Sequence, residues 1–237
     1  MLLRHNLKRW LKAQAAEKLF WQTSRHAGSP DRTYWKDILK QSGVTFDFFK
    51  DKDILEVGCG PRGLIYLIDE ARSRIGVEPM NMLHWIEEWK QKFVINGIGE
   101  KLPFDDVIFD VVICFNTLDH TKQPASVIKE CHRVLRDNGY LLLWVHALRN
   151  PYSIFRGFLN KVDSPHPYHL TVRDIKKLVE NYFEIKDEKL VKGTGIFGHI
   201  KASGSIKLLI SNYLTENIWL QLRKHPLSFS FTHQSCH

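Results

Sequence analysis

The sequence predicts an α/β fold in which a mainly parallel sheet carries helices on both faces. From residue 53 onward, short apolar segments alternate with amphipathic ones, which is the order of strands and helices in a sheet with right-handed crossovers. Residues 109–115 are apolar almost throughout, as expected for a strand that helices cover on both sides. The first predicted strand runs into a glycine-rich turn, which is where open α/β sheets place a ligand.

The individual elements follow from the same patterns. Strands are expected at residues 53–57, 74–78, 93–96, 109–115, 140–145 and 183–191. Helices are expected at residues 64–71, 80–92 and 124–136, and from a start at Thr171 with Asp174 three residues on. Asn138-Gly139 should end the helix at 124–136, with the glycine in the left-handed cap.

The chain divides into three predicted parts. Residues 1–50 form an N-terminal helical cap, because apolar residues recur there at helical spacing. Residues 51–192 form the sheet domain, and residues 193–237 form a C-terminal extension with a helix over 205–222. The length of 237 residues and the hydrophobic share of 43% suit one α/β domain with such additions.

The composition favours a cytoplasmic protein. No run of about 18 apolar residues occurs, and the N-terminus lacks the apolar block of a secretory signal. The four cysteines include no C-x-x-C pair, and Cys59, Cys114 and Cys131 stand in apolar surroundings typical of buried free thiols. We therefore expect neither disulfides nor a metal site.

The formal net charge of +8 leaves two classes of partner to consider. The basic residues are spread along the chain without a dense block, so we expect no nucleic-acid partner. The basic amphipathic segments at residues 4–18 and 206–224 leave peripheral contact with a membrane surface open. The oligomeric state does not follow from the sequence.

The turn after the first strand is the most informative segment. Gly58, Gly60 and Gly63 have the spacing G-x-G-x-x-G, and Glu78 follows at the end of the next strand. Glycines permit positive φ and close approach of a ligand, and an acid at this place can hold ribose hydroxyls. The pattern predicts a site for an adenosine-containing cofactor, either a dinucleotide or another nucleoside.

Glu56 favours the second of these cofactors. A carboxylate two residues before the first glycine would lie near any pyrophosphate, and like charges repel. The same carboxylate would suit a cationic ligand that carries a sulfonium and an ammonium group.

Five segments in order resemble the class I S-adenosylmethionine-dependent methyltransferases, and most closely the broad type 11 group, which modifies small molecules. They are Glu56-Val57-Gly58-Cys59-Gly60-Pro61, Gly76-Val77-Glu78-Pro79, Gly99-Glu100-Lys101-Leu102-Pro103-Phe104-Asp105-Asp106, Phe109-Asp110-Val111-Val112 and Leu118-Asp119-His120. The resemblance covers about residues 50–148. It implies a Rossmann-like fold and S-adenosylmethionine as the cofactor.

The resemblance also implies cofactor contacts at matched positions. The methionine end would be surrounded by Glu56, Gly58, Cys59 and Gly60. The adenosine would meet Glu78, Pro79, Met80, Gly99 and Glu100, of which Glu78 would hold both ribose hydroxyls. Asn116 and Asp119 would face the cofactor after the fourth strand.

Two positions depart from the family pattern. The family usually carries an aspartate for the adenine amine shortly before the Leu-Pro-Phe run, whereas this chain has Ile98 there, with Glu100 as a substitute. Arg62 stands where many members have glycine, and Gly63 follows one place later. We therefore expect a slightly different turn.

Four histidines are candidates for the chemistry, because histidine can exchange a proton near neutral pH. His120 and His146 follow predicted strands at the carboxyl edge of the sheet and are the candidate catalytic residues. The alternatives are orientation of the loop for His120 and a structural hydrogen bond for His146. His166 and His169 stand in a proline-rich segment that is predicted to be a substrate lid or a rigid connector.

The leading interpretation is a methyltransferase that uses S-adenosylmethionine to modify a small molecule. A nicotinamide-dependent oxidoreductase, a non-catalytic S-adenosylmethionine-binding protein and an RNA methyltransferase are the alternatives. Neither a target-base motif of the Asn-Pro-Pro-Tyr type nor a separate RNA-binding domain is visible. The sequence identifies neither the acceptor nor its reacting atom.

Overall fold

The computed structural model describes residues 2–23, 31–82, 86–157, 167–192 and 215–225. The helices are α1 (Leu2–Thr23), α2 (Arg32–Gln41), α3 (Glu88–Gln91), α4 (Pro124–Val134) and α6 (Val172–Val179). Short 3-10 turns are η1 (Phe46–Phe49), η2 (Leu64–Tyr66), η3 (Leu118–His120) and η4 (Asn150–Phe155). The strands are β1 (Asp53–Val57), β2 (Ser73–Glu78), β3 (Val94–Asn96), β4 (Phe109–Phe115), β5 (Leu135–Leu148), β6 (Phe183–Lys192) and β7 (Thr215–Lys224).

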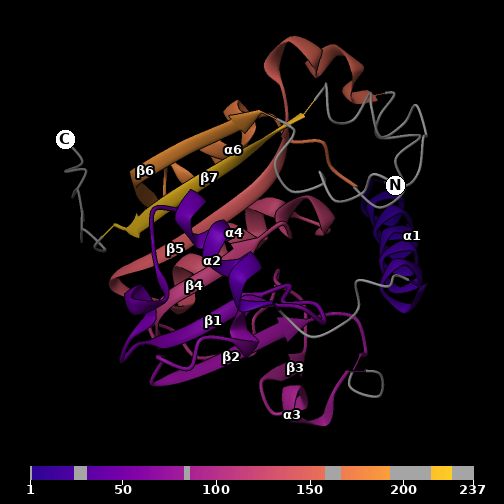
Figure 1. The fold of residues 1–237 in the computed structure, drawn as a ribbon. Coiled ribbons are helices and arrows are strands. Elements are labelled where there is room, and N and C mark those ends of the chain that lie inside the picture. The colour runs from indigo at the N-terminus through magenta and orange to yellow at the C-terminus, as the bar shows by residue number, and fades with distance from the viewer. Residues whose placement is uncertain (1, 24–30, 83–85, 158–166, 193–214, 226–237) are drawn as a thin grey trace, which may run out of the picture.

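These strands form one sheet in the order β3-β2-β1-β4-β5-β7-β6. β1 to β5 pair in parallel, and β7 lies antiparallel between β5 and β6 (Figure 1). The order reverses between β1 and β4, so the carboxyl ends of these two strands border the crevice where such sheets bind ligands. The predicted mainly parallel α/β sheet is confirmed.

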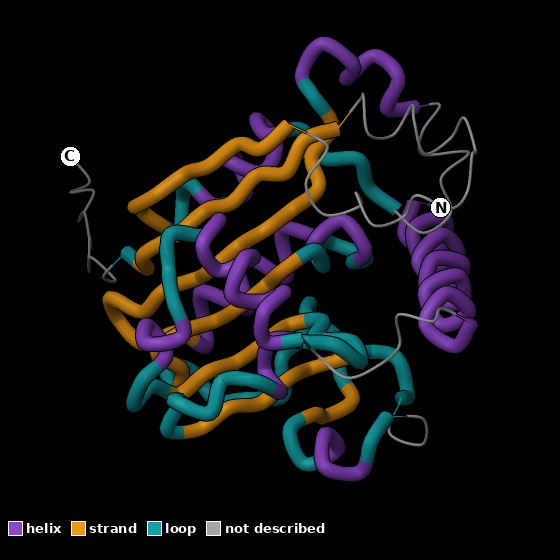
Figure 2. Tube along the Cα trace, in the orientation of Figure 1, coloured by secondary structure: helices purple, strands orange, loops and turns teal. Residues whose placement is uncertain are grey.

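Two apolar layers cover the sheet on opposite faces (Figure 2). α4 and α6 bury one face through Val127, Ile128 and Ile175, and the capping box expected at Thr171 and Asp174 is confirmed at the start of α6. α2, η1 and η2 bury the other face, where aromatic rings dominate. Such two-sided burial explains why the central strands are apolar almost throughout.

The helix expected over residues 205–222 is wrong for the part that is described. Residues 215–222 belong to β7, which fills the gap between β5 and β6, and residues 205–214 lie outside the described residues. Ile218, Trp219 and Leu220 are all buried, because both faces of β7 are covered. A continuously apolar run does not by itself distinguish such a strand from a helix.

Three other helix predictions need correction. The predicted helix at 64–71 is only the 3-10 turn η2, and α3 is the only described helix within 80–92. α4 ends at Val134, because Leu135 already pairs with Phe109 in the sheet. The residue with positive φ is Asn138 (62°) rather than Gly139, where a Cβ atom would lie 2.8 Å from the Arg136 carbonyl oxygen.

α1 lies across the edge at which β4 ends (Figure 1). Its Arg9 guanidinium donates to the Pro167 carbonyl oxygen, and the Lys122 ammonium lies 4.1 Å from the centre of the Trp10 ring. These contacts hold α1 to segments that follow β4 and precede α6. The division of the chain at residues 50 and 192 stays a prediction, and β7 beyond residue 192 is hydrogen-bonded into the sheet.

The Trp219 ring should carry a large share of the stability of β7, because it stacks on Trp144 with ring centres 4.5 Å apart and is 2% exposed. We expect Trp219→Ala to lower the free energy of unfolding by about 3–5 kcal/mol. Trp89→Ala is the matched control, since Trp89 is 44% exposed and should cost about 0.5 kcal/mol. Urea denaturation of both variants measures the difference, and equal losses would contradict this assignment.

Candidate cofactor site

The glycine turn follows β1 and is shaped by two left-handed residues. Gly58 has φ of 71° and Gly60 has φ of 53°, conformations that side chains rarely tolerate. A Cβ atom on Gly58 would lie 2.3 Å from Cγ2 of Thr117, so the turn also needs glycine there for space. At Gly60 a Cβ atom would meet only the Trp21 ring, at 4.0 Å, which leaves room on that side of the turn.

Glu56 lies beneath the turn and is 2% exposed. Its carboxylate accepts the backbone N–H groups of Leu64 at 3.2 Å and Ile65 at 2.7 Å. Burial raises the pKa of Glu56 to about 8, although the two N–H groups oppose the shift. Gly63 is required for space rather than by its φ of −53°, because a Cβ atom would lie 2.6 Å from the Cys59 carbonyl oxygen and 2.8 Å from Glu56 Oε2.

Glu78 joins the turn to the end of β2. Its Oε2 atom accepts the Gly60 N–H at 3.0 Å, and its Oε1 atom accepts the Met80 N–H at 3.0 Å. The side chain is buried, and burial raises the pKa of Glu78 to about 7, with a further contribution from the negative charge of Glu17 on α1. A carboxylate therefore lies at the point where the turn, β2 and α1 converge.

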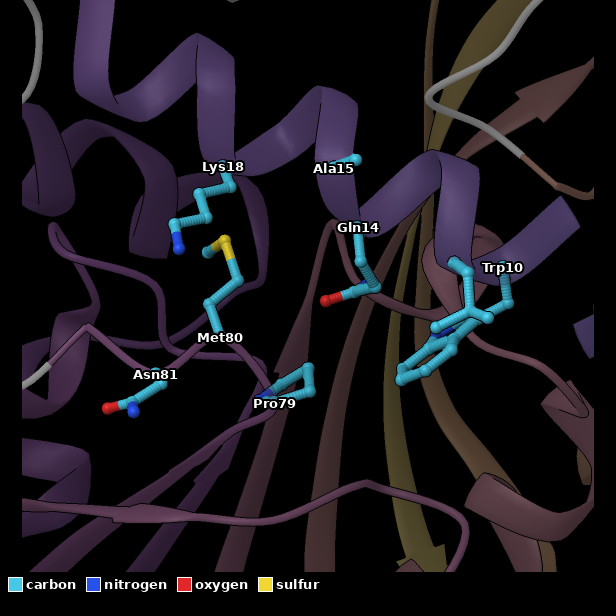
Figure 3. Close-up of a pocket in the computed structure, with 8 residues that line it drawn as sticks. Trp10, Gln14, Ala15, Lys18, Pro79, Met80 and Asn81 are labelled. Atoms are coloured by element: carbon cyan, nitrogen blue, oxygen red, sulfur yellow. The ribbon is translucent and has the colours of Figure 1, made fainter. Parts of the chain in front are cut away.

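A cleft of about 270 Å³ opens beside Glu78, between α1 and the residues that follow β2 (Figure 3). Its lining residues are Trp10, Leu11, Gln14, Ala15, Lys18, Pro79, Met80 and Asn81. Gln14 points from α1 toward Pro79, and Lys18 lies beside Met80 (Figure 3). The cleft has the mixed character of a small-molecule site, with apolar walls and a few polar groups.

The other residues expected near adenine have backbone and packing contacts. Glu100 accepts the N–H groups of Lys122 at 2.5 Å and Gln123 at 3.2 Å, just before α4. A Cβ atom on Gly99 would lie 2.8 Å from Val57, so glycine allows close packing there. Glu100 therefore binds backbone N–H groups just before α4, and its contact with adenine stays a prediction.

Asn116 and Asp119 follow β4 beside the turn. Asn116 has φ of 50°, and its N–H donates to the Trp144 carbonyl oxygen. Asp119 is 2% exposed, and its Oδ1 atom is buried without a hydrogen-bond partner among the described residues. Such an atom is costly unless a ligand or a water molecule satisfies it.

The structure separates the two candidate catalytic histidines. His120 ends η3 with its Nδ1 atom 3.5 Å from Glu17 Oε1, beneath α1. His146 is engaged by β7 at both ring nitrogens, with Nδ1 3.1 Å from Asn217 Oδ1 and Nε2 2.6 Å from Thr215 Oγ1. His120 thus lies with Glu17 near the cofactor turn, whereas His146 is fixed within the sheet.

Of the two histidines in the proline-rich segment, only His169 is described, and it is 9% exposed. His166 lies outside the described residues, so the predicted lid is untested. Within the described ranges, no group of three His, Cys, Asp or Glu side chains could hold a metal ion, and no helix is long and apolar enough to cross a bilayer.

The site also includes residues that the sequence patterns did not reveal. α1 supplies Glu17 and half of the cleft, and Trp35, Tyr66 and Lys90 bind the backbone of the turn. No spacing rule connects α1 to a turn some forty residues later, since their contact arises only when α1 packs across the sheet edge. In the sequence, only the basic and aromatic residues of α1 could have indicated that this helix contributes to the site, and such residues are equally typical of a solvated helix.

Comparison with known proteins agrees with this geometry. Residues 55–143 match the family model described as a methyltransferase domain. A protein of Mycolicibacterium smegmatis, named a probable S-adenosylmethionine-dependent methyltransferase, is 29% identical over 140 residues, or 57% of this chain and 53% of the relative. The ubiquinone biosynthesis O-methyltransferase of Yersinia enterocolitica is 30% identical over 112 residues, or 44% of this chain and 45% of that protein.

Solved methyltransferases share the fold of this chain. The geranyl diphosphate C-methyltransferase of Streptomyces coelicolor superposes with a TM-score of 0.63 at 11% identity, covering 81% of this chain and 77% of that one. That protein was solved with S-adenosyl-L-homocysteine and geranyl diphosphate. The chain spans about half the length of the curated relatives it matches. Residues 55–143 thus match a methyltransferase domain, the chain is similar in sequence to S-adenosylmethionine-dependent methyltransferases, and its sheet has the fold of solved methyltransferases.

Proposed function

We propose that this chain transfers a methyl group from S-adenosylmethionine to a small-molecule acceptor at the carboxyl edge of β1, β2 and β4. The observation that carries the proposal is the position of Glu78, a buried carboxylate that accepts the Gly60 N–H of the glycine turn and directly precedes Pro79 and Met80, which line the cleft beneath α1. A nucleoside with two ribose hydroxyls would find acceptors there, and its base would enter the cleft beside Pro79 and Met80.

The residues present fit this cofactor. Space beside Gly60 admits a ligand against the turn, and the unpartnered Oδ1 atom of Asp119 offers an acceptor within η3. Glu56 accepts the Leu64 and Ile65 N–H groups beneath the turn, so its support for a cationic ligand is indirect. Glu78, which directly precedes the cleft residues Pro79 and Met80, is the better candidate for direct contact.

S-adenosylmethionine, when bound, supplies an electrophilic methyl group on a sulfonium sulfur. The turn and Glu78 would orient the cofactor, and α1 would shield the reacting groups from water, which are the main contributions an enzyme makes to an in-line displacement. His120 would take a proton from the acceptor. Its Nδ1 atom lies 3.5 Å from Glu17 Oε1, a contact that would help to orient the imidazole.

His146 has a positioning role in this proposal. The Trp144 indole N–H donates to Asn217 Oδ1, so this oxygen is an acceptor, and His146 Nδ1 must donate to the same atom. In neutral His146 the remaining nitrogen, Nε2, then accepts from the Thr215 hydroxyl. Both contacts tie the end of β5 to β7 and leave His120 as the better candidate base.

The O-methyltransferase names of several relatives favour an oxygen nucleophile on the acceptor. We therefore propose a hydroxyl-bearing acceptor, whose proton His120 would remove. The buried free thiols of Cys59, Cys114 and Cys131 suit a reducing compartment such as the cytoplasm. α1 also carries exposed Leu7 and Leu19 among lysines, which suits peripheral contact with an anionic membrane.

The function can be tested by calorimetry followed by a transfer assay. S-adenosylmethionine should bind and NAD should not, and radiolabelled methyl should then appear on a component of a metabolite extract. Binding of NAD alone would favour the oxidoreductase alternative. Tight binding of S-adenosylmethionine without transfer to any component would favour a non-catalytic binding protein.

Binding of S-adenosylhomocysteine should weaken as the pH falls from about 8 to about 6. Glu78 accepts hydroxyl donors best as a carboxylate, and its pKa is raised to about 7 in the free protein, so protons compete with the ligand below that pH. The dissociation constant should rise by up to about tenfold per pH unit below the pKa. Titrations of wild type and Glu78→Gln test this, since the variant should bind weakly with a flat profile, and a flat wild-type profile would be contrary to the proposal.

His120→Ala should lower kcat by about a hundredfold, a typical loss for a general base, while binding S-adenosylhomocysteine almost as wild type does. Glu17→Gln should have a smaller effect and change the pH profile of kcat, because Glu17 contacts the imidazole of His120. Both are measured with the first acceptor that the transfer assay identifies. Normal turnover of His120→Ala would remove His120 from the chemistry.

A further inference from the structure

Three consecutive carbonyl groups of the glycine turn are each held by a different side chain. The Tyr66 hydroxyl donates to the Gly60 carbonyl oxygen at 2.9 Å. The Lys90 ammonium donates to the Pro61 carbonyl oxygen at 3.0 Å, and the Trp35 indole N–H donates to the Arg62 carbonyl oxygen at 2.9 Å. We call Tyr66, Lys90 and Trp35 the carbonyl clamp.

The members of the carbonyl clamp come from three elements and are buried. Trp35 belongs to α2, Tyr66 to η2 and Lys90 to α3, with exposures of 7%, 2% and 0%. Burial raises the pKa of Tyr66, so its hydroxyl keeps the proton that it donates. Three polar side chains, taken out of water to meet one short backbone segment, indicate that the conformation of this segment matters.

Lys90 is the member of the carbonyl clamp whose burial has the highest cost in free energy. A fully buried ammonium group is costly unless it is paired, and Lys90 is paired with Glu87 and lies 5.4 Å from the centre of the Tyr66 ring. The same tyrosine that binds Gly60 thus also supports the cation that binds Pro61. Lys90 and Tyr66 therefore act as a unit rather than as two separate hydrogen bonds.

The carbonyl clamp also fixes the direction of the N–H groups in the turn. A trans peptide points its N–H away from its carbonyl, and the described residues contain no cis peptide. Holding the Pro61 and Arg62 carbonyls therefore also fixes the directions in which the Arg62 and Gly63 N–H groups point. The opposite ends of the turn are set independently, by Glu78 at Gly60 and by Glu56 at Leu64.

We propose that Tyr66, Lys90 and Trp35 are positioning residues that hold the glycine turn in the shape that binds the amino-acid end of the cofactor. This inference rests on the proposed function, in which the turn meets the methionine portion and the cleft beneath α1 meets the adenosine. The carbonyl clamp touches neither the acceptor nor the transferred methyl group. Its loss should weaken cofactor binding and leave the methyl transfer step unchanged.

Two ligands that share the adenosine but differ in the amino-acid end test this inference. Tyr66→Phe and Trp35→Phe each remove one donor and keep a ring in place. Each should bind S-adenosylhomocysteine about three- to tenfold more weakly, the usual effect of one hydrogen bond, and bind 5′-methylthioadenosine as wild type does. In turnover, the KM for S-adenosylmethionine should rise by the same factor at unchanged kcat.

Tyr140→Phe is the matched control. It removes a tyrosine hydroxyl at the far end of β5, where the ring packs on Phe48, and should leave the binding of both ligands unchanged. Thermal unfolding without ligand shows whether each variant is folded. Lys90→Met should give a larger loss than Tyr66→Phe, and the double variant should lose less than the sum, because the two residues act as a unit.

The outcomes separate this inference from the proposed function. Unchanged affinity for S-adenosylhomocysteine in both Tyr66→Phe and Trp35→Phe would overturn the carbonyl clamp and leave the function standing. An equal loss of affinity for both ligands would also overturn the carbonyl clamp, because the variants would then affect binding of the adenosine as well as of the amino-acid end. A wild-type protein that bound neither ligand would instead contradict the proposed function.

Discussion

Two carboxylates buried under one backbone turn determine the architecture of the site. Glu56 and Glu78 leave β1 and β2 at adjacent positions of the sheet edge, and each accepts two backbone N–H groups. A turn with two left-handed glycines has few internal hydrogen bonds, so its donors need such partners. The sheet supplies the acceptors at fixed positions, and the turn adopts its shape over them. The cleft beneath α1 opens where the second carboxylate, Glu78, emerges.

α1 lies outside the part of the chain that matches the methyltransferase family, and it contributes residues to the site at the edge of the sheet. The family model covers residues 55–143, which include the turn and both carboxylates but not α1. Yet α1 supplies Glu17 to His120, closes the cleft with Trp10 and Gln14, and is held to the end of β4 through the contact of Lys122 with Trp10. The part of the fold that the family model covers therefore provides the turn and both carboxylates, whereas α1, which lies outside it, adds Glu17 and one wall of the cleft.

The sequence predicted those features that depend on local pattern. β4 was predicted to the residue, because a strand covered on both faces is apolar wherever it is buried. The turn and Glu78 followed from spacing along the chain. β7 was missed, because its apolar run fits a helix until β5 and β6 are known to flank it. Lys90 and Trp35 could not be predicted, since only folding brings α2 and α3 to the same three carbonyl groups.

Burial of these acids also links stability to ligand binding. Both have pKa values raised above the ordinary 4.5, so between about pH 4.5 and 8 the unfolded chain releases protons that the folded protein keeps. The folded state then binds more protons, and the contribution of Glu56 and Glu78 to stability falls as the pH rises through that window. A ligand whose hydroxyls donate to Glu78 stabilises its ionised form and offsets part of this loss. In the proposed function, the same carboxylate that carries this electrostatic cost in the free protein is the one that would accept the ribose hydroxyls.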